Sequence, residues 1–211
     1  LAWNHALHGG NVLGYHLVNT AIHLLAGLAL WAFLRAALRG PALDPAARPW
    51  LRWVPLLAAA LFLAHPLQTQ AVTYVVQRYA SLAALLYLAT LACYAWGRIK
   101  GSALLLAAAG VCALLAVFTK QNAVTVFAAL ALAELVLLRA LDARARLAVV
   151  AGTLLAAVLV VWLINLPPLD AWTRETREIS RIDYLATQMG VLWRYVGLFF
   201  LPVDQRLEYD L

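Results

Sequence analysis

The sequence predicts an all-α fold, a polytopic bundle of about six membrane-spanning helices plus one further helix that lies in the outer interface or spans. Of its 211 residues, 65% are hydrophobic and only 12% are charged, whereas about a quarter of the residues of soluble domains are charged. The mean hydropathy is +0.81. Several apolar stretches of membrane length also follow one another along the chain. These observations together favour a membrane protein over a soluble domain.

The first three expected helices differ in length. Residues 15–38 are apolar over a stretch long enough to cross the hydrocarbon. A loop over 35–52 follows, in which several prolines oppose helix formation. A short apolar helix over 54–64 ends at His65-Pro66, and a long helix over 71–96 follows with Gln68 or Thr69 as its cap.

Four more helices are expected in the second half of the chain. Apolar stretches over 102–118 and 123–138 are separated by a polar break at 119–122, and residues 147–164 span again. The last stretch, 184–201, is less apolar, carries Gln188 and Arg194, and stops at Pro202. It therefore crosses the membrane or lies in its outer interface, and the sequence leaves both possibilities open.

The distribution of basic residues predicts how the bundle is oriented. Loops 35–52, 97–101 and 139–146 each have a surplus of Arg and Lys, which places them in the cytoplasm. The N-terminus and the breaks at 65–70 and 119–122 then lie outside. Because most of the cations lie in short loops beside apolar helices, the net charge of +6 does not indicate a nucleic-acid partner.

A set of polar side chains on the outer side forms the candidate substrate-binding site. Polar side chains within or at the boundary of the membrane hydrocarbon are costly in free energy unless they face protein, water or a ligand. Arg78 and Lys120 each stand near a helix N-terminus, where anions are favoured, so together they predict a cradle for phosphate or pyrophosphate. Alternatively, Arg78 snorkels and Lys120 only solvates a turn. The candidate residues are His65, Gln68, Gln70, Gln77, Arg78, Lys120 and Gln121.

Other polar residues have simpler interpretations. His16, Asn19 and His23 recur at helical spacing and are expected to support the bundle through inter-helix hydrogen bonds. No carboxylate lies near them at ligand spacing, so no metal site is predicted. Cys93 and Cys112 fall inside apolar helices, which argues against a disulfide or a zinc site. Glu134 is expected to form an ion pair with Arg139 rather than to act in catalysis.

Several motifs, taken in their order and spacing, resemble one known family. They are GYHLVN at 14–19, AHPLQTQAV at 64–72 leading to QR at 77–78, TKQNAV at 119–124, LP at 201–202 and LEYD at 207–210. Together they resemble the GT-C-type membrane glycosyltransferases related to the transmembrane and tetratricopeptide-repeat protein O-mannosyltransferases, particularly bacterial members. The block from His65 to Arg78 is the most specific part of the resemblance.

This resemblance implies transfer of a sugar from a polyprenyl-phosphate donor to an acceptor hydroxyl, of the Ser/Thr type in proteins. It places the protein in a bacterial inner membrane with a periplasmic active face, and implies no cofactor besides the donor. Family members carry a catalytic Asp upstream of the first helix seen here and a repeat domain downstream. Residues 1–211 are therefore expected to be a single transmembrane domain within a longer chain, with the catalytic residue unassigned.

Two other functions stay open. Gln121 stands where relatives commonly have Glu, which favours a non-catalytic membrane scaffold that anchors a repeat domain and binds lipid head groups. A transporter is disfavoured, because the sequence shows neither an inverted repeat nor a pair of broken helices.

Overall fold

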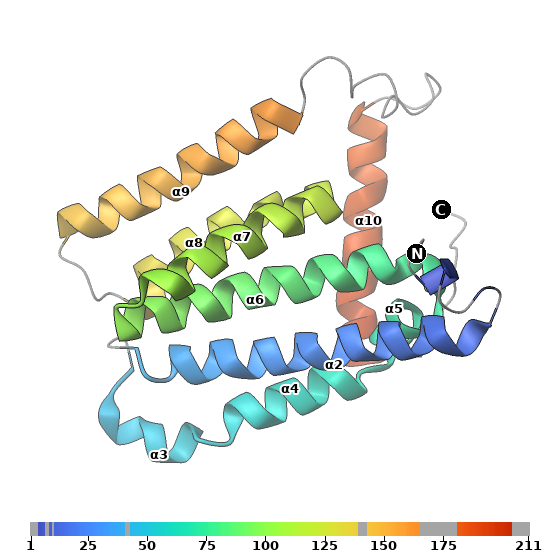
Figure 1. Ribbon diagram of the computed structural model, residues 1–211, viewed down its shortest axis with the longest axis horizontal. Helices are drawn as coiled ribbons and strands as arrows, with labels where there is room; N and C mark the ends of the chain where they lie inside the picture. The colour runs from blue at the N-terminus through green and yellow to red at the C-terminus, as the bar shows by residue number, and fades with distance from the viewer. Residues whose placement is uncertain are drawn as a thin grey trace.

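The computed structural model describes residues 4–6, 9, 11–40, 43–138, 143–164 and 181–203. Within these ranges the chain is helical apart from short connections, and no strand occurs (Figure 1). The prediction of an all-α fold is confirmed. The main helices are α2 (Val12–Ala37), α3 (Arg48–Leu51), α4 (Val54–Ala64), α5 (Thr69–Thr73), α6 (Arg78–Lys100), α7 (Ala103–Thr119), α8 (Val126–Ala133), α9 (Ala143–Ile164) and α10 (Arg181–Phe200).

Short irregular turns join several of these helices. Three-residue 3-10 turns precede α3, α5 and α6, at Pro45–Ala47, Pro66–Gln68 and Val75–Gln77. A longer 3-10 turn, Gln121–Thr125, leads into α8, and α8 continues into a π-helical turn at Glu134–Leu138. These turns matter because the polar residues of interest lie on or beside them.

Fewer helices reach membrane length than the sequence predicted. Four stretches are long and apolar enough to cross a membrane: Val12–Ala37, Val75–Lys100, Gln121–Leu138 and Ala143–Leu163. The pair Pro49–Ala64 and Pro66–Thr73, bent by 52°, would make a fifth. Helix α7 is apolar but has only 17 residues. Among the described residues the number by length and composition is therefore four or five, rather than about six.

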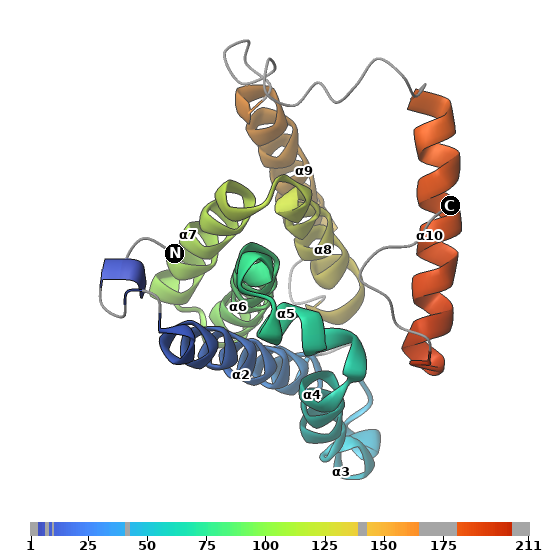
Figure 2. The same ribbon diagram turned by 90° about the vertical axis from the view of Figure 1, so that its right-hand side faces the viewer.

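Helix α6 is the centre of the bundle and packs against α2 on one side and α7 on another (Figure 2). The core around it joins Leu91, Tyr94 and Ala95 to residues of α2, α7 and α8. Many buried residues are alanines, which let helix backbones approach closely as in membrane bundles. Large apolar side chains point outward instead, for example Leu155 and Val158 of α9.

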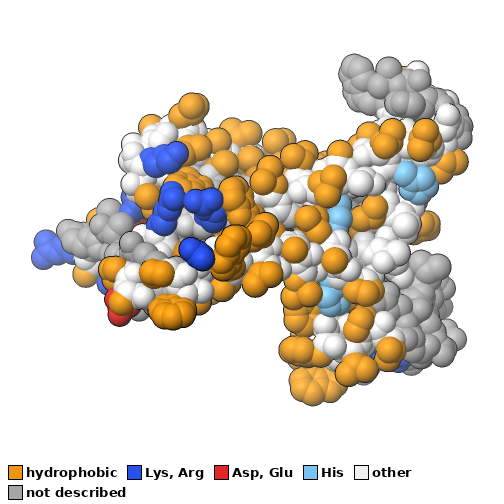
Figure 3. Space-filling view, turned by 90° about the horizontal axis from the view of Figure 1, so that it is seen from below, with side chains coloured by type: hydrophobic (Ala, Val, Ile, Leu, Met, Phe, Trp, Pro, Cys, Tyr) orange, Lys and Arg blue, Asp and Glu red, His pale blue; other side chains and the backbone are white. Residues whose placement is uncertain are grey.

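The helices alternate in direction, so the basic loops gather at one end of the bundle. Helices α2 and α6 end there, and α4, α7 and α9 begin there (Figure 1). We call it the cation-rich end, and Figure 3 shows Lys and Arg side chains gathered on it. Its described basic side chains are Arg35, Arg39, Arg52, Arg98, Lys100, Arg144 and Arg146. The opposite end, where α2 and α6 begin, is called the Arg78 end.

Helix α10 runs across the other helices, beside the Arg78 end (Figures 1 and 2). Its C-terminal turn contacts His65, which stacks on the ring of Phe199 with centroids 5.3 Å apart. Helix α10 is not one of the four apolar stretches of membrane length.

Gly97 permits the close packing of α6 on α7. A Cβ atom at Gly97 would lie 2.9 Å from Leu106 Cδ2 and 3.1 Å from the Leu106 backbone nitrogen. We expect Gly97→Val to lower the free energy of unfolding by about 1–3 kcal/mol through overpacking, measured by denaturation in detergent. Gly110→Val is the control, because no atom lies within 4 Å of a Cβ atom there. Equal losses in the two variants would contradict this account.

Candidate functional site

The guanidinium of Arg78 lies inside the bundle and joins three segments of the chain. Its Nε donates to Asn19 Oδ1 at 2.6 Å, Nη1 to Asn4 Oδ1 at 2.8 Å, and Nη2 to the Tyr15 carbonyl at 3.0 Å. The residue is only 7% exposed, and its Cζ lies 5.7 Å from the centroid of the Tyr15 ring. Arg78 therefore holds the start of α6 against α2 and against the residues before α2.

The two asparagines that accept from Arg78 extend the same network. Asn19 is fully buried and donates through Nδ2 to the Val72 carbonyl of α5 at 3.1 Å. Asn4 donates to the Gly14 carbonyl at 3.0 Å. All these partners are neutral, so no described carboxylate offsets the charge of Arg78. A guanidinium has five N–H donors, and these contacts leave one on each Nη without a described partner.

Lys120 lies in a different environment at the same end. It is exposed, has extended backbone angles (φ −153°, ψ 123°), and separates α7 from the turn Gln121–Thr125. Together with polar Asn122 and Thr125 it borders a groove of about 380 Å³. The rest of the groove is apolar and is formed by Ala80, Ala83, Ala84, Tyr87, Leu88 and Ala123. The site is thus a groove of mainly small side chains that is bordered by a single cation.

The structure does not bring Arg78 and Lys120 into one cradle. Arg78 points from α6 toward α2, whereas Ala80, Ala84 and Tyr87 of the same helix face the groove that Lys120 borders. Arg78 is not among the residues that line this groove. The joint phosphate cradle predicted from the sequence is thereby replaced by two separate features, a buried arginine network and an exposed lysine groove.

His65 connects the chain break to α10. Its Nδ1 accepts from the Leu67 backbone N–H at 3.2 Å, so the proton is on Nε2, which donates to the Phe199 carbonyl at 3.0 Å. Both ring nitrogens are therefore engaged, and the imidazole caps the turn Pro66–Gln68. In this arrangement His65 joins the turn Pro66–Gln68 to the C-terminal part of α10.

The remaining predicted residues are spread over this end of the bundle. Asn19 and His23 make inter-helix hydrogen bonds of the expected kind, since His23 Nε2 donates to the Leu63 carbonyl at 3.1 Å. Gln68 lines a small cavity of about 100 Å³ beside His23. Gln70 and His16 are half-buried, and Gln77 and Gln121 are exposed.

Among the described residues no group of three His, Cys, Asp or Glu side chains could hold a metal ion.

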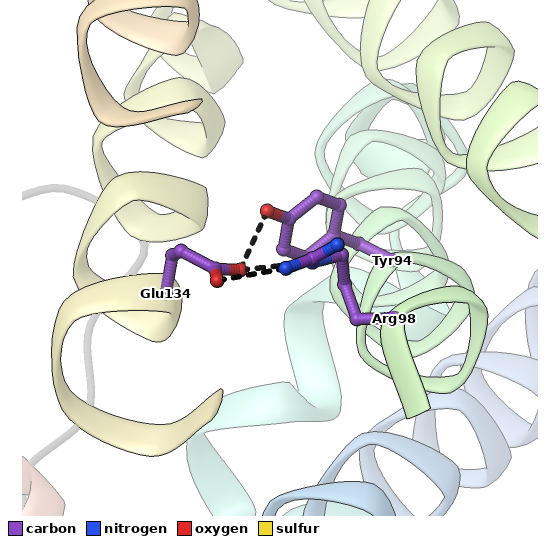
Figure 4. A network of polar contacts seen from close by, with 3 residues as sticks. All are labelled: Tyr94, Arg98 and Glu134. Carbon is purple, nitrogen blue, oxygen red and sulfur yellow. Dashed lines mark hydrogen bonds and ion pairs between the residues drawn. The ribbon is translucent and has the colours of Figure 1, made fainter. Parts of the chain in front are cut away.

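A second buried network lies at the cation-rich end (Figure 4). Glu134 is fully buried and accepts from the Tyr94 hydroxyl at 2.8 Å. Arg98 grips the same carboxylate with two bonds, Nε to Oε2 at 3.1 Å and Nη2 to Oε1 at 3.0 Å. The sequence predicted an ion pair of Glu134 with Arg139, which lies outside the described residues, and the partner found is Arg98. The sequence feature that could have indicated this network is the spacing of Tyr94 and Arg98, which are four residues apart and so share one helix face.

These features define the chain as an all-helical protein with four or five apolar helices of membrane length, compatible with a membrane protein. Its buried polar groups form two networks, one at each end of α6. No family model, curated protein or solved structure matches the chain.

Proposed function

We propose that this chain is an integral membrane protein and part of a GT-C-type glycosyltransferase that uses a polyprenyl-phosphate sugar donor. The observation that supports this most is the Lys120 groove, in which an exposed cation borders a surface of mainly apolar side chains. A lipid-linked sugar phosphate has the complementary form, an anionic group on an apolar chain. The positive-inside rule puts the cation-rich end in the cytoplasm, so the groove opens at the periplasmic side.

In this proposal the Lys120 ammonium stabilises the negative charge that develops on the leaving phosphate. Such stabilisation is commonly the largest single contribution of an active site. Asn122 and Thr125 border the phosphate end of the groove, and the isoprenoid chain lies along Tyr87 and Leu88. Arg78 acts indirectly, by holding the start of α6 and hence one wall of the groove.

Deprotonation of the acceptor hydroxyl calls for a general base, typically a carboxylate. Asp44 and Glu134 are the carboxylates whose side chains the structure describes, and both lie toward the cation-rich end. The base in this proposal therefore comes from another segment, as the resemblance to the O-mannosyltransferases implies. The acceptor is a hydroxyl of the protein Ser/Thr type.

Lys120→Ala tests the donor site. In the full-length protein reconstituted in vesicles, we expect the rate of sugar transfer from polyprenyl-phosphate sugar to fall on the order of a hundredfold. Lys120→Arg keeps the charge and should retain much of the rate. Lys100→Ala, the same change at the cation-rich end, is the matched control. A Lys120→Ala enzyme as fast as the unmodified protein would remove the groove from the mechanism.

A non-catalytic membrane scaffold is the second candidate. It is favoured by Gln121, which is exposed directly beside Lys120 at the position where the similar family commonly has Glu. A scaffold would bind the lipid-linked sugar through Lys120 without transferring the sugar. Donor binding without turnover in the full-length protein would support this function, and any transferase activity lost with Lys120→Ala would exclude it.

A further inference from the structure

A cationic cleft lies at the cation-rich end, between α2 and the start of α4. It has a volume of about 760 Å³ and is bordered by Arg35, Arg39 and Arg52, with Trp31, Trp53 and Leu56 among its apolar walls. Figure 3 shows Lys and Arg side chains beside hydrophobic ones at this end of the molecule. The cleft is separate from the Lys120 groove, which lies at the other end of the bundle, and from the Glu134 network, none of whose residues line it.

Aromatic rings hold the arginines of this cleft in place. Arg35 Cζ lies 4.9 Å from the centroid of Trp31, and Arg52 Cζ lies 5.3 Å from that of Trp53. An arginine held beside an aromatic ring by this attraction still has N–H donors to offer an oxyanion. Within the described ranges, the only ion pair closer than 4.0 Å is Arg98–Glu134, so neither arginine has a described carboxylate partner.

The walls of the cleft indicate what kind of anion fits. Leu56 is 50% exposed and Trp53 is 56% exposed, so exposed apolar surface lies beside the arginines. Trp and Arg together are typical of the boundary between head groups and acyl chains. A free phosphate ion would use the arginines and leave these apolar side chains uncovered. A phospholipid would cover both, with its phosphate on the arginines and its acyl chains along Leu56.

We propose that this cleft binds the phosphate head group of an anionic phospholipid from the leaflet at the cation-rich end. Basic pockets between helices on the cytoplasmic side are suited to such head groups. Bound there, the phosphate bridges Arg35 of α2 and Arg52 just before α4, and so holds the short α4 against the bundle. This assignment rests on the proposed insertion in a membrane and does not depend on the proposed transferase activity.

Native mass spectrometry of the purified full chain tests the proposal with phosphatidylglycerol and phosphatidylcholine of identical acyl chains as probes. We expect selective retention of phosphatidylglycerol, reduced on the order of tenfold in the double variant R35Q/R52Q. The matched control is R144Q/R146Q, which removes the same charge from α9 at the same end and changes no residue that lines the cleft. Circular dichroism establishes that each variant is folded.

Several outcomes would overturn the proposal. Equal retention of the two lipids, or equal losses in the two double variants, would mean that no specific head-group site exists. Displacement of phosphatidylglycerol by inorganic phosphate at similar concentration would assign the cleft to free phosphate instead. Leu56→Trp keeps every charge and narrows the cleft, so it decides the matter if R35Q/R52Q does not fold. Reduced retention in Leu56→Trp supports the lipid site, and unchanged retention excludes it.

Discussion

Glu134→Ala is expected to lower the free energy of unfolding by about 3 kcal/mol, the low end for a broken buried ion pair. The substitution leaves the Tyr94 hydroxyl and the Arg98 guanidinium without the acceptor they share. The cost stays at the low end because the Arg98 side chain is 18% exposed and can reach water. Thermal or chemical unfolding of the purified protein in detergent measures the loss.

Two further variants separate the charge from the packing at this site. Glu134→Gln keeps the shape and one acceptor oxygen, so it should cost less than alanine. The double variant E134A/R98A should recover part of the loss, because it no longer leaves a cation facing an apolar core. Strictly additive losses in the double variant would show that the two residues are not energetically coupled.

Arg78→Ala is expected to cost about 3 kcal/mol and to loosen the residues before α2. The change removes three hydrogen bonds from a charged donor, and leaves the buried Asn19 Oδ1 and the Tyr15 carbonyl without their partners. Unfolding in detergent measures the stability, and limited proteolysis near Asn4 measures the loosening. The stability of Arg78→Lys should lie between that of Arg78→Ala and that of the unmodified protein, since lysine keeps the charge but cannot reach all three acceptors.

The comparison with Lys120→Ala shows whether Arg78 acts by positioning. In our account Arg78→Ala lowers both stability and sugar transfer, whereas Lys120→Ala lowers transfer alone. A double-mutant cycle with Asn19→Leu should give a coupling energy of about 1 kcal/mol or more, because the two side chains share a bond. An Arg78→Ala protein of normal stability that no longer binds donor would instead identify Arg78 as a direct donor ligand.

The long helix predicted over 71–96 shows how far local patterns reach. The structure divides this stretch at Tyr74, which is extended (φ −88°, ψ 111°), and begins α6 at Arg78. No proline or glycine marks the break. It is stabilised instead by contacts such as the bond from Ser81 Oγ to the Ala71 carbonyl at 2.7 Å. Such contacts join separate segments of the chain, so the length of an apolar stretch does not predict them.

The candidate site was predictable in part. The helix break beside Lys120 and the inter-helix hydrogen bonds of Asn19 and His23 were predictable, because polar residues are costly within an apolar segment unless they find partners. The partners of Arg78 and Glu134 could not be predicted, because each partner is on another helix. Asn19 is 59 residues from Arg78, and Arg98 is 36 residues from Glu134. Arg78 and Lys120 were predicted to share a ligand. The rotation of α6 about its axis directs Arg78 toward α2, away from the groove that Lys120 borders.

The sequence by itself determined that the protein is all-helical, that several helices are long and apolar enough for a membrane, and that three basic loops lie at the same end of the bundle. Composition and spacing carry these properties, because hydrocarbon length and loop charge are local features of the chain. Only the tertiary structure decided which buried polar groups meet, where the grooves lie and how α10 is directed. These depend on the rotation of each helix about its axis and on close packing at residues such as Gly97, which local composition does not specify.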